Sequence, residues 1–366
     1  MKILYLFDTT DRAESESVIE MAQHGVEPTI CCRPDAPMRK RFEQAGLEVI
    51  PLPLRSKLDL QSIRILRQLR RSRQFDIVHA YYKIALTNYN LAAVGLPRVP
   101  VIAYRGIIGN LSYWDPFSWL SFLDPRIERI VCVCEAIRQY FLGKPFFLGL
   151  RLFSPEQVVT IHKGHQPQWY QQPEPQLPDD LQVPNEALVI GCVSRMKKRK
   201  GIIELINAFE QIPAEFNAYL LLVGPIEDKI IEQSVRRSSA AARIRLTGYR
   251  TDAPKIAGAF DIKTLPSLRR EGLPRAVIEA MAQGIPAVVS DSGGNPDLVI
   301  DGQSGRVVPA GDTEALRVAL TELIANPELR QQMGKAAAQR IKEDFTVEKT
   351  VTQTLKLYRE LAPAAS

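Results

Sequence analysis

The sequence predicts an α/β protein of two domains, each built around a parallel sheet. The chain has 366 residues, which is long enough for two ordinary domains. Apolar strand-like runs alternate with helical segments from residue 1 to about 165, and a second alternating block begins at Ala187. Between the blocks, Gln166–Pro184 is rich in proline and glutamine, which is typical of a linker. Such alternation favours doubly wound sheets, which bind ligands beyond the carboxyl ends of their strands.

The first block, residues 1–165, contains seven short apolar runs that we interpret as strands. They are Ile3–Phe7, Pro28–Cys32, Glu48–Pro51, Ile77–His79, Val101–Tyr104, Arg129–Cys134 and Val158–His162. Helical periodicity lies between several of them, at Ser15–Gln23, Met38–Ala45, Leu60–Arg71 and Glu135–Phe141.

The second predicted domain, residues 166–346, includes the linker and the second block, which contains six further strand candidates. They are Val189–Val193, Tyr219–Val223, Ile244–Thr247, Ile262–Leu265, Ala287–Val289 and Gly305–Val308. The clearest helices of this block are expected over Gly201–Gln211 and Leu273–Gln283, and residues 347–366 add a C-terminal helix over Val347–Leu361.

Composition places the chain among globular proteins of the cytoplasm. Hydrophobic residues make up 45% and charged residues 24%. The apolar run at the start of MKILYLFDTTDR is broken by Asp8, so it is too short for a signal peptide or a membrane span. Five cysteines lie in apolar runs without a CxxC pair, which indicates reduced core residues. The four histidines have no ligand-like spacing and the sequence has no DxD pair, so we expect no metal site.

The net charge of +6 is unevenly distributed. Five arginines between residues 64 and 73 crowd one predicted helix, and five cations between residues 195 and 200 crowd one loop. Such runs are usually solvated, but they also suit phosphates or an anionic membrane. No nucleic-acid-binding signature accompanies them, so we expect no nucleic-acid partner.

The stretch Pro266–Pro309 contains the densest set of features in the chain. Glu271 and Glu279 are separated by seven residues, and Pro274 suits the first position of a helix because its missing N–H would have no partner there. We therefore expect Glu271 in the loop ahead of a helix and Glu279 inside it.

The same loop is suited to a phosphate-bearing ligand. The N–H groups of Gly272 and Leu273, with the positive end of the helix dipole, would attract an anion. Carboxylates on both sides would accept hydrogen bonds from sugar and ribose hydroxyls. The alternative is a pair of solvated glutamates; no single basic residue has an obvious claim on both.

This stretch resembles the donor-sugar motif of the retaining, GT-B-fold glycosyltransferases of family four, the glycosyl transferases group 1. The family pattern EGxPxxxxEAMAxGxP followed by GG appears here as EGLPRAVIEAMAQGIP followed by Gly293 and Gly294. The resemblance implies two Rossmann-like domains facing each other across a cleft, with the last helix returning to the first domain. It further implies that Glu271 contacts the donor sugar and that Glu279 binds the nucleotide ribose.

A second motif, GCVSRMKKRKGIIELINAF, passes from a strand through a basic loop into a helix at Gly201. Fixed cations at such a turn can hold a diphosphate and offset the charge on a leaving phosphate. The resemblance places the family's phosphate-binding pair at Arg195 and Lys200. The other three cations of the loop have no counterpart in the family, and we interpret them as solvated.

The chain departs from the family on the acceptor side. Where the family usually has a histidine after its fourth amino-domain strand, this sequence has Arg105, which either contacts phosphate or acceptor or is an ordinary strand-end residue. The first loop, residues 8–12, lacks the Gly-Gly pair that many members have. His79 ends another strand and His165 lies beside the linker, and both are interpreted as structural.

The resemblance implies a retaining glycosyltransferase that uses a nucleoside-diphosphate sugar, no cofactor and no metal ion. Its acceptor would be a glycan or a lipid-linked molecule, in cell-surface polysaccharide or lipopolysaccharide assembly. Two alternatives stay open: a non-catalytic nucleotide-sugar-binding protein, and a nicotinamide-dependent oxidoreductase. The oxidoreductase would need a GxGxxG turn after the first strand, where the chain has Phe7-Asp8-Thr9-Thr10.

The segment Ile107–Leu123 is unusually apolar for a connection and must be covered by something. The alternatives are the protein core and a membrane surface, where Trp and Tyr lie at the headgroup level. Arg64, Arg67, Arg70 and Arg71 could supply cations for anionic lipid. The second alternative predicts peripheral attachment to the inner face of the cytoplasmic membrane.

Overall fold

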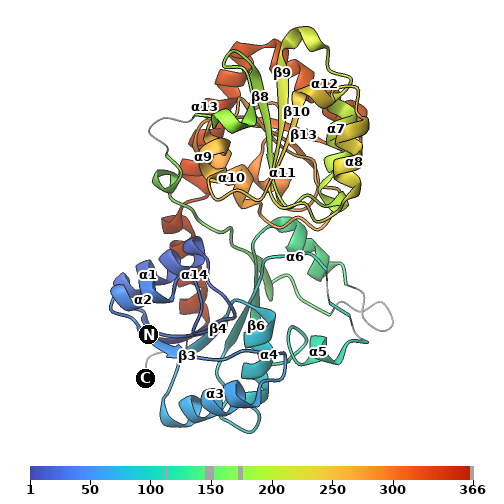
Figure 1. Ribbon diagram of the computed structural model, residues 1–366. Helices are drawn as coiled ribbons and strands as arrows, with labels where there is room; N and C mark the ends of the chain where they lie inside the picture. The colour runs from blue at the N-terminus through green and yellow to red at the C-terminus, as the bar shows by residue number, and fades with distance from the viewer. Residues whose placement is uncertain (110, 113, 145–151, 172–175, 363–366) are drawn as a thin grey trace. The chain divides into compact units, whose positions relative to one another are not determined.

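The computed structural model describes residues 1–109, 111–112, 114–144, 152–171 and 176–362, and its contacts divide the chain into two compact units (Figure 1). The first unit contains Met1–Gly164 and Thr346–Ser366, and the second contains His165–Phe345. Each is an α/β layer structure around one parallel sheet, so the predicted class of two Rossmann-like domains is confirmed.

The sheet of the first unit has the strand order β3-β2-β1-β4-β5-β6-β7. Its strands are β1 (Lys2–Phe7), β2 (Glu27–Cys32), β3 (Glu48–Pro51), β4 (Ile77–Ala80), β5 (Val101–Arg105), β6 (Ile127–Cys132) and β7 (Val158–Thr160). Strands covered on both faces need apolar residues throughout, which explains runs such as ILYLF in β1, all of it buried. The strand order reverses between β1 and β4.

Among the described residues, seven α-helices pack around this sheet: α1 (Arg12–Gln23), α2 (Arg39–Gln44), α3 (Leu60–Ser72), α4 (Lys83–Ala92), α5 (Pro116–Trp119), α6 (Glu135–Leu142) and α14 (Val347–Leu361). Helix α14 packs along α1, as Figure 1 shows, and the Thr350 hydroxyl donates to the carbonyl of His162 at 2.7 Å. The C-terminal segment is therefore part of the first unit.

The sheet of the second unit has the strand order β10-β9-β8-β11-β12-β13. Its strands are β8 (Leu188–Val193), β9 (Ala218–Val223), β10 (Ile244–Gly248), β11 (Ile262–Leu265), β12 (Ala287–Ser290) and β13 (Gly305–Val308). Its α-helices are α7 (Ile202–Phe209), α8 (Ile230–Arg237), α9 (Ala253–Gly258), α10 (Arg275–Ala282), α11 (Asn295–Leu298), α12 (Thr313–Ala325) and α13 (Pro327–Asp344). Here the order reverses between β8 and β11, which are hydrogen-bonded neighbours.

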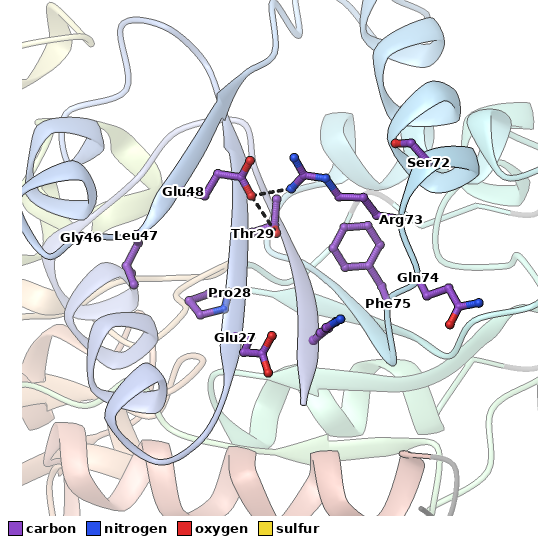
Figure 2. A pocket seen from close by; sticks show the side chains of 11 residues that line it. Glu27, Pro28, Thr29, Gly46, Leu47, Glu48, Ser72, Arg73, Gln74 and Phe75 are labelled. Atoms are coloured by element: carbon purple, nitrogen blue, oxygen red, sulfur yellow. Dashed lines mark hydrogen bonds and ion pairs between the residues drawn. The ribbon is translucent and has the colours of Figure 1, made fainter. Parts of the chain in front are cut away.

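A hollow of about 580 Å³ lies at the amino-terminal ends of β1, β2 and β3 (Figure 2). Glu48 accepts hydrogen bonds there from Arg73 at 2.5 Å and from Thr29 at 3.4 Å, so these charges are satisfied within the protein. Because parallel sheets bind ligands at the opposite ends of their strands, we assign no function to this hollow.

Candidate active site

The two motifs of the second unit meet at the point where its strand order reverses. The basic loop follows β8, and the loop that contains Glu271 follows β11, the next strand in the sheet. The two loops approach each other closely at two points. The N–H of Leu268 donates to the carbonyl of Arg199 at 2.9 Å, and a Cβ at Gly201 would come within 1.9 Å of the carbonyl oxygen of Pro266. Gly201 has φ +69°, so its lack of a side chain serves both the turn and the packing.

Lys200 and Glu271 form a buried ion pair across these loops. The Lys200 ammonium lies 2.6 Å from Glu271 Oε2, which also accepts a 2.6 Å hydrogen bond from the hydroxyl of Ser267. The Ser290 hydroxyl in turn donates to the carbonyl of Ser267. No single basic residue was expected to have a claim on both glutamates, and Lys200 pairs with Glu271 alone, but the Lys200–Glu271 pair itself was not predicted. Sequence reasoning missed it because the partner is 71 residues away in the chain.

Glu279 is also buried and paired, although its partner is local. It lies in α10, where Arg275, one helical turn earlier, donates to its Oε1 at 2.6 Å. The Arg275 side chain is largely exposed, whereas Glu279 is buried. Pro274 is the N-cap of α10 rather than its first helical residue, so the helix begins later than predicted.

The Gly-Gly turn supports the backbone of Glu271. A Cβ at Gly293, which has φ +65°, would come within 2.1 Å of the carbonyl oxygen of Glu271. The N–H of Gly294 donates to the carbonyl of Gly272 at 2.9 Å. In the described part of the chain, the N–H groups of Gly272 and Leu273 donate no hydrogen bond, so both are available to a ligand.

Arg195 and Lys200 have very different surroundings. The side chain of Arg195 is 57% exposed and lies 3.7 Å from Glu227, whereas that of Lys200 is 11% exposed. Glu227 also pairs with Lys197, so this cation of the loop is not simply solvated. Arg195 is therefore an exposed cation of the loop, whereas Lys200 is buried and paired with Glu271.

The structure adds a buried cation that the sequence analysis did not single out. Lys263, in the middle of β11, is fully buried, and its ammonium has no hydrogen-bond partner among the described residues. Burial lowers its pKa to about 8, although the nearby Cys192 and Glu279 oppose this shift and Lys200 adds to it. A lysine within an otherwise apolar strand is the sequence feature that could have indicated this buried cation.

The remaining site candidate, Arg105, for which a phosphate or acceptor contact and an ordinary strand-end role were both open, belongs to the first unit. It is buried, and its guanidinium donates to the carbonyls of Ile107 at 2.9 Å and of Gly109 and stacks on Phe122 at 4.9 Å. Burial lowers its pKa. Arg105 thus holds the loop that follows β5, as a strand-end residue with structural contacts.

Both histidines singled out in the sequence are buried beside tyrosines. The Nδ1 atom of His79 lies 2.7 Å from the hydroxyl of Tyr358 in α14, and burial lowers the pKa of His79 to about 3. The Nδ1 atom of His165 lies 2.5 Å from the hydroxyl of Tyr170. These contacts agree with their structural interpretation.

The apolar segment Ile107–Leu123 is divided between core and surface. Among its described residues, Leu111, Phe122 and Leu123 are buried, whereas Trp114 is 94% and Trp119 45% exposed. No described helix is long and apolar enough to cross a membrane.

The arginines of α3 are less available to anionic lipid than predicted. Arg67 donates to the carbonyls of Ala92 and Val94 at the end of α4, and Arg70 is buried and donates to that of Pro97. These two arginines therefore hold the end of α4, whereas Arg64 and Arg71 are exposed.

Two protein-family models match the chain. Residues 174–340 match glycosyl transferases group 1, and residues 15–146 match the glycosyl transferase 4-like domain.

Among the described residues, no group of three or more His, Cys, Asp or Glu could hold a metal ion.

Curated relatives are similar to the whole chain or to half of it. The lipopolysaccharide core biosynthesis glycosyltransferase LpsE of Rhizobium meliloti (strain 1021) is 28% identical over 355 residues, 92% of each chain. N-acetyl-alpha-D-glucosaminyl L-malate synthase of Bacillus anthracis is 28% identical over 51% of this chain and 49% of that protein. The capsular polysaccharide biosynthesis glycosyltransferase CapM of Staphylococcus aureus is 30% identical over 44% and 43%. The chain thus spans about half the length of the last two relatives.

Solved structures share the fold over nearly the full length. A glycosyltransferase from Rickettsia africae ESF-5 has a TM-score of 0.82 at 18% identity, covering 100% of this chain and 99% of that one. Anabaena Alr3699/HepE in complex with UDP and glucose has a TM-score of 0.78 at 22% identity, covering 98% and 100%. Since each unit also matches its own family model, the chain belongs to the group 1 glycosyltransferases and has their GT-B fold.

Proposed function

We propose that the protein transfers a sugar from a nucleoside diphosphate to a glycan or lipid-linked acceptor, with retention of configuration and without a metal ion. The observation that supports this most is the buried Lys200–Glu271 pair at the reversal of strand order. A fixed cation, a carboxylate and the unused amides of Gly272 and Leu273 lie together there, and these groups suit a diphosphate joined to a sugar.

Each group has a role in this mechanism. As the bond between the anomeric carbon and the phosphate oxygen breaks, its electron pair leaves with the diphosphate. Lys200, Arg195 and the amides of Gly272 and Leu273 offset that negative charge, while Glu271 holds the sugar and stabilises the positive charge on it. Glu279 binds the ribose. Retention requires the acceptor hydroxyl to enter on the side from which the diphosphate leaves, where a phosphate oxygen can take its proton.

The relatives agree with this choice of substrates. The Anabaena protein was crystallised with UDP and glucose, and the Rhizobium relative is named for lipopolysaccharide core biosynthesis. A role in assembling lipopolysaccharide or another cell-surface polysaccharide, on the cytoplasmic side, follows for this chain as part of the proposal.

Thermal denaturation with a panel of nucleoside diphosphates and diphospho-sugars tests the proposal, because a ligand of the native state raises the melting temperature. At least one diphosphate should raise it, and the matching diphospho-sugar should support transfer in the presence of chelator. Loss of activity on chelation, restored by magnesium or manganese, would contradict the metal-free mechanism. A non-catalytic binding protein would show the shift without any transfer or hydrolysis.

The proposal includes peripheral attachment to an anionic membrane through the first unit. Trp114 and Trp119 are exposed, and Leu58 and Leu60 are 50% and 68% exposed. Arg64 and Arg71 of α3 are exposed and could contact anionic lipid. Co-sedimentation with anionic vesicles should exceed that with neutral vesicles, and Trp114→Ala with Trp119→Ala should reduce it without unfolding the protein. Equal sedimentation with both vesicle types at low salt would argue against attachment.

A further inference from the structure

A hollow in the first unit is lined by two lysines, and exposed apolar residues adjoin its lining residues in the chain. It has a volume of about 510 Å³ and is lined by Lys57, Lys83, Leu111, Ser112 and Asp115. Lys83 is the first residue of α4 and follows the carboxyl end of β4. Strand β4 lies beside β1, where the strand order of this sheet reverses, and doubly wound sheets bind ligands at that place.

The two lysines are held by weak contacts that leave their charge available. The Lys57 ammonium lies 4.5 Å from the centre of the Phe117 ring, and the Lys83 ammonium lies 3.4 Å from Asp115 Oδ2. Asp115 is the N-cap of α5 and already accepts hydrogen bonds from the N–H of Phe117 and the hydroxyl of Ser118. Two cations therefore face one carboxylate that is largely committed to the protein.

The start of α4 does not supply the anion-binding groups itself. Asp8 accepts hydrogen bonds from the N–H groups of Ile84 at 3.1 Å and Ala85 at 2.5 Å, which occupies that helix end. An anion in this hollow would thus be bound by Lys57 and Lys83, each of which has three N–H donors.

Exposed apolar residues next to the lining residues in the sequence favour an amphiphilic ligand over a soluble phosphate. Leu58 and Leu60 follow Lys57 in the chain, Trp114 precedes Asp115, and all three are exposed. Large apolar side chains exposed beside cations suit an amphiphile, whose charged head and hydrocarbon chain would each find a partner.

We propose that this hollow binds the phosphate of a lipid-linked acceptor, with the lipid chain against Leu58, Leu60 and Trp114. This inference rests on the proposed function, because it specifies the acceptor as a phosphate-bearing lipid. The phosphate is bound by Lys57 and Lys83, and the sugar or hydroxyl to be extended is attached to it.

Soluble probes test the hollow directly. Dodecyl phosphate, dodecyl maltoside and inorganic phosphate are titrated below their micelle concentrations, with binding measured by calorimetry. The wild-type protein should bind dodecyl phosphate at least tenfold more tightly than either other probe. Lys57→Gln with Lys83→Gln should remove that preference. Lys57→Arg with Lys83→Arg should retain it, as should the control Lys40→Gln, an exposed lysine of α2.

Four outcomes would overturn the proposal. Equal affinity for the two dodecyl compounds would mean that the apolar residues alone provide the binding. Equal affinity for dodecyl phosphate and inorganic phosphate would mean that the apolar residues contribute nothing. Unchanged binding in the Gln variant would place the phosphate elsewhere. Vesicles with polyprenyl phosphate should also recruit the protein better than phosphatidylglycerol vesicles of equal surface charge; equal recruitment would indicate a general membrane contact.

The proposed donor site can be tested separately in the same variants. Lys57 and Lys83 belong to the first unit, whereas the predicted donor residues belong to the second. The thermal shift with nucleoside diphosphate should therefore be unchanged in the Gln variant. Loss of dodecyl phosphate binding with the nucleotide shift intact supports the hollow, and an absent nucleotide shift in the wild type would refute the proposed function instead.

Discussion

Replacing Lys263 with methionine should stabilise the second unit at neutral pH. Lys263 is fully buried, and its ammonium has no hydrogen-bond partner among the described residues. Methionine has a similar length and no charge, so Lys263→Met removes the cost of burying the ammonium without opening a large cavity.

The size of the effect follows from the pKa. Burial lowers the pKa of Lys263 from 10.5 to about 8. Between these values the unfolded state binds more protons than the folded state, so the stability of the wild-type protein rises with pH in this window. At 1.36 kcal/mol per pKa unit, the buried charge costs up to about 3 kcal/mol below pH 8, and the cost disappears above pH 10.5. The gain from Lys263→Met should be largest at pH 7 and small at pH 10.5.

Urea denaturation at both pH values measures the difference. In a Trp114→Phe, Trp119→Phe background, Trp169 is the remaining tryptophan. Its fluorescence reports on unfolding of the second unit, because it packs against the core of that unit. Lys335→Met, at an exposed position of α13, is the control and should change stability little at either pH. If Lys263→Met is less stable than the wild type at pH 7, or if its gain is the same at both pH values, the charge at Lys263 does not limit stability.

Three further predictions concern the candidate site. Glu271→Gln should lose most transfer activity and still bind nucleoside diphosphate, because the carboxylate acts on the sugar; turnover near that of the wild type would contradict its role. Lys200→Ala should weaken diphosphate binding by about tenfold or more, since a hydrogen bond to a charged group contributes about 1.5–3 kcal/mol. The exposed Lys198→Ala should have little effect, and equal losses in calorimetry would indicate diffuse electrostatics. Gly293→Ala should cost more stability than Gly248→Ala, because both glycines have positive φ but only Gly293 faces a backbone atom closer than 4 Å; equal melting temperatures would remove the argument for close packing.

Local patterns predicted most strands and the site helix. The predictions at Glu48–Pro51, Ile262–Leu265 and Gly305–Val308 coincide with β3, β11 and β13. All of β11 is buried, as expected of a central strand covered on both faces, whereas β3 and β13 lie at sheet edges and are less buried. Helix α4 was not predicted. Its buried residues include Ala85, Leu86 and Tyr89 but also Thr87 and Asn88, whose side chains donate to backbone carbonyls, so polar residues interrupt its apolar stripe.

Contacts between distant parts of the chain were beyond the reach of such patterns. The grouping of Arg195, Lys200, Glu271 and Glu279 came from a family resemblance, whereas their pairing came from the structure. Neither the Lys200–Glu271 pair nor the use of Arg67 to hold the end of α4 leaves a local trace, since an arginine that faces a carbonyl 25 residues away looks the same in sequence as a solvated one.

The length of the donor-sugar motif can be explained by the support that Glu271 needs. A buried carboxylate is stable only with a cation and hydrogen bonds, and Lys200 and Ser267 supply these. Ser290 fixes the carbonyl of Ser267, and Gly293 allows the next turn to approach the carbonyl of Glu271. Ser267, Ser290 and Gly293 of the motif therefore position one side chain and its loop. The structure thus predicts that substitutions at Ser267 or Gly293 lower the transfer rate more than they weaken nucleotide binding, because they act through Glu271.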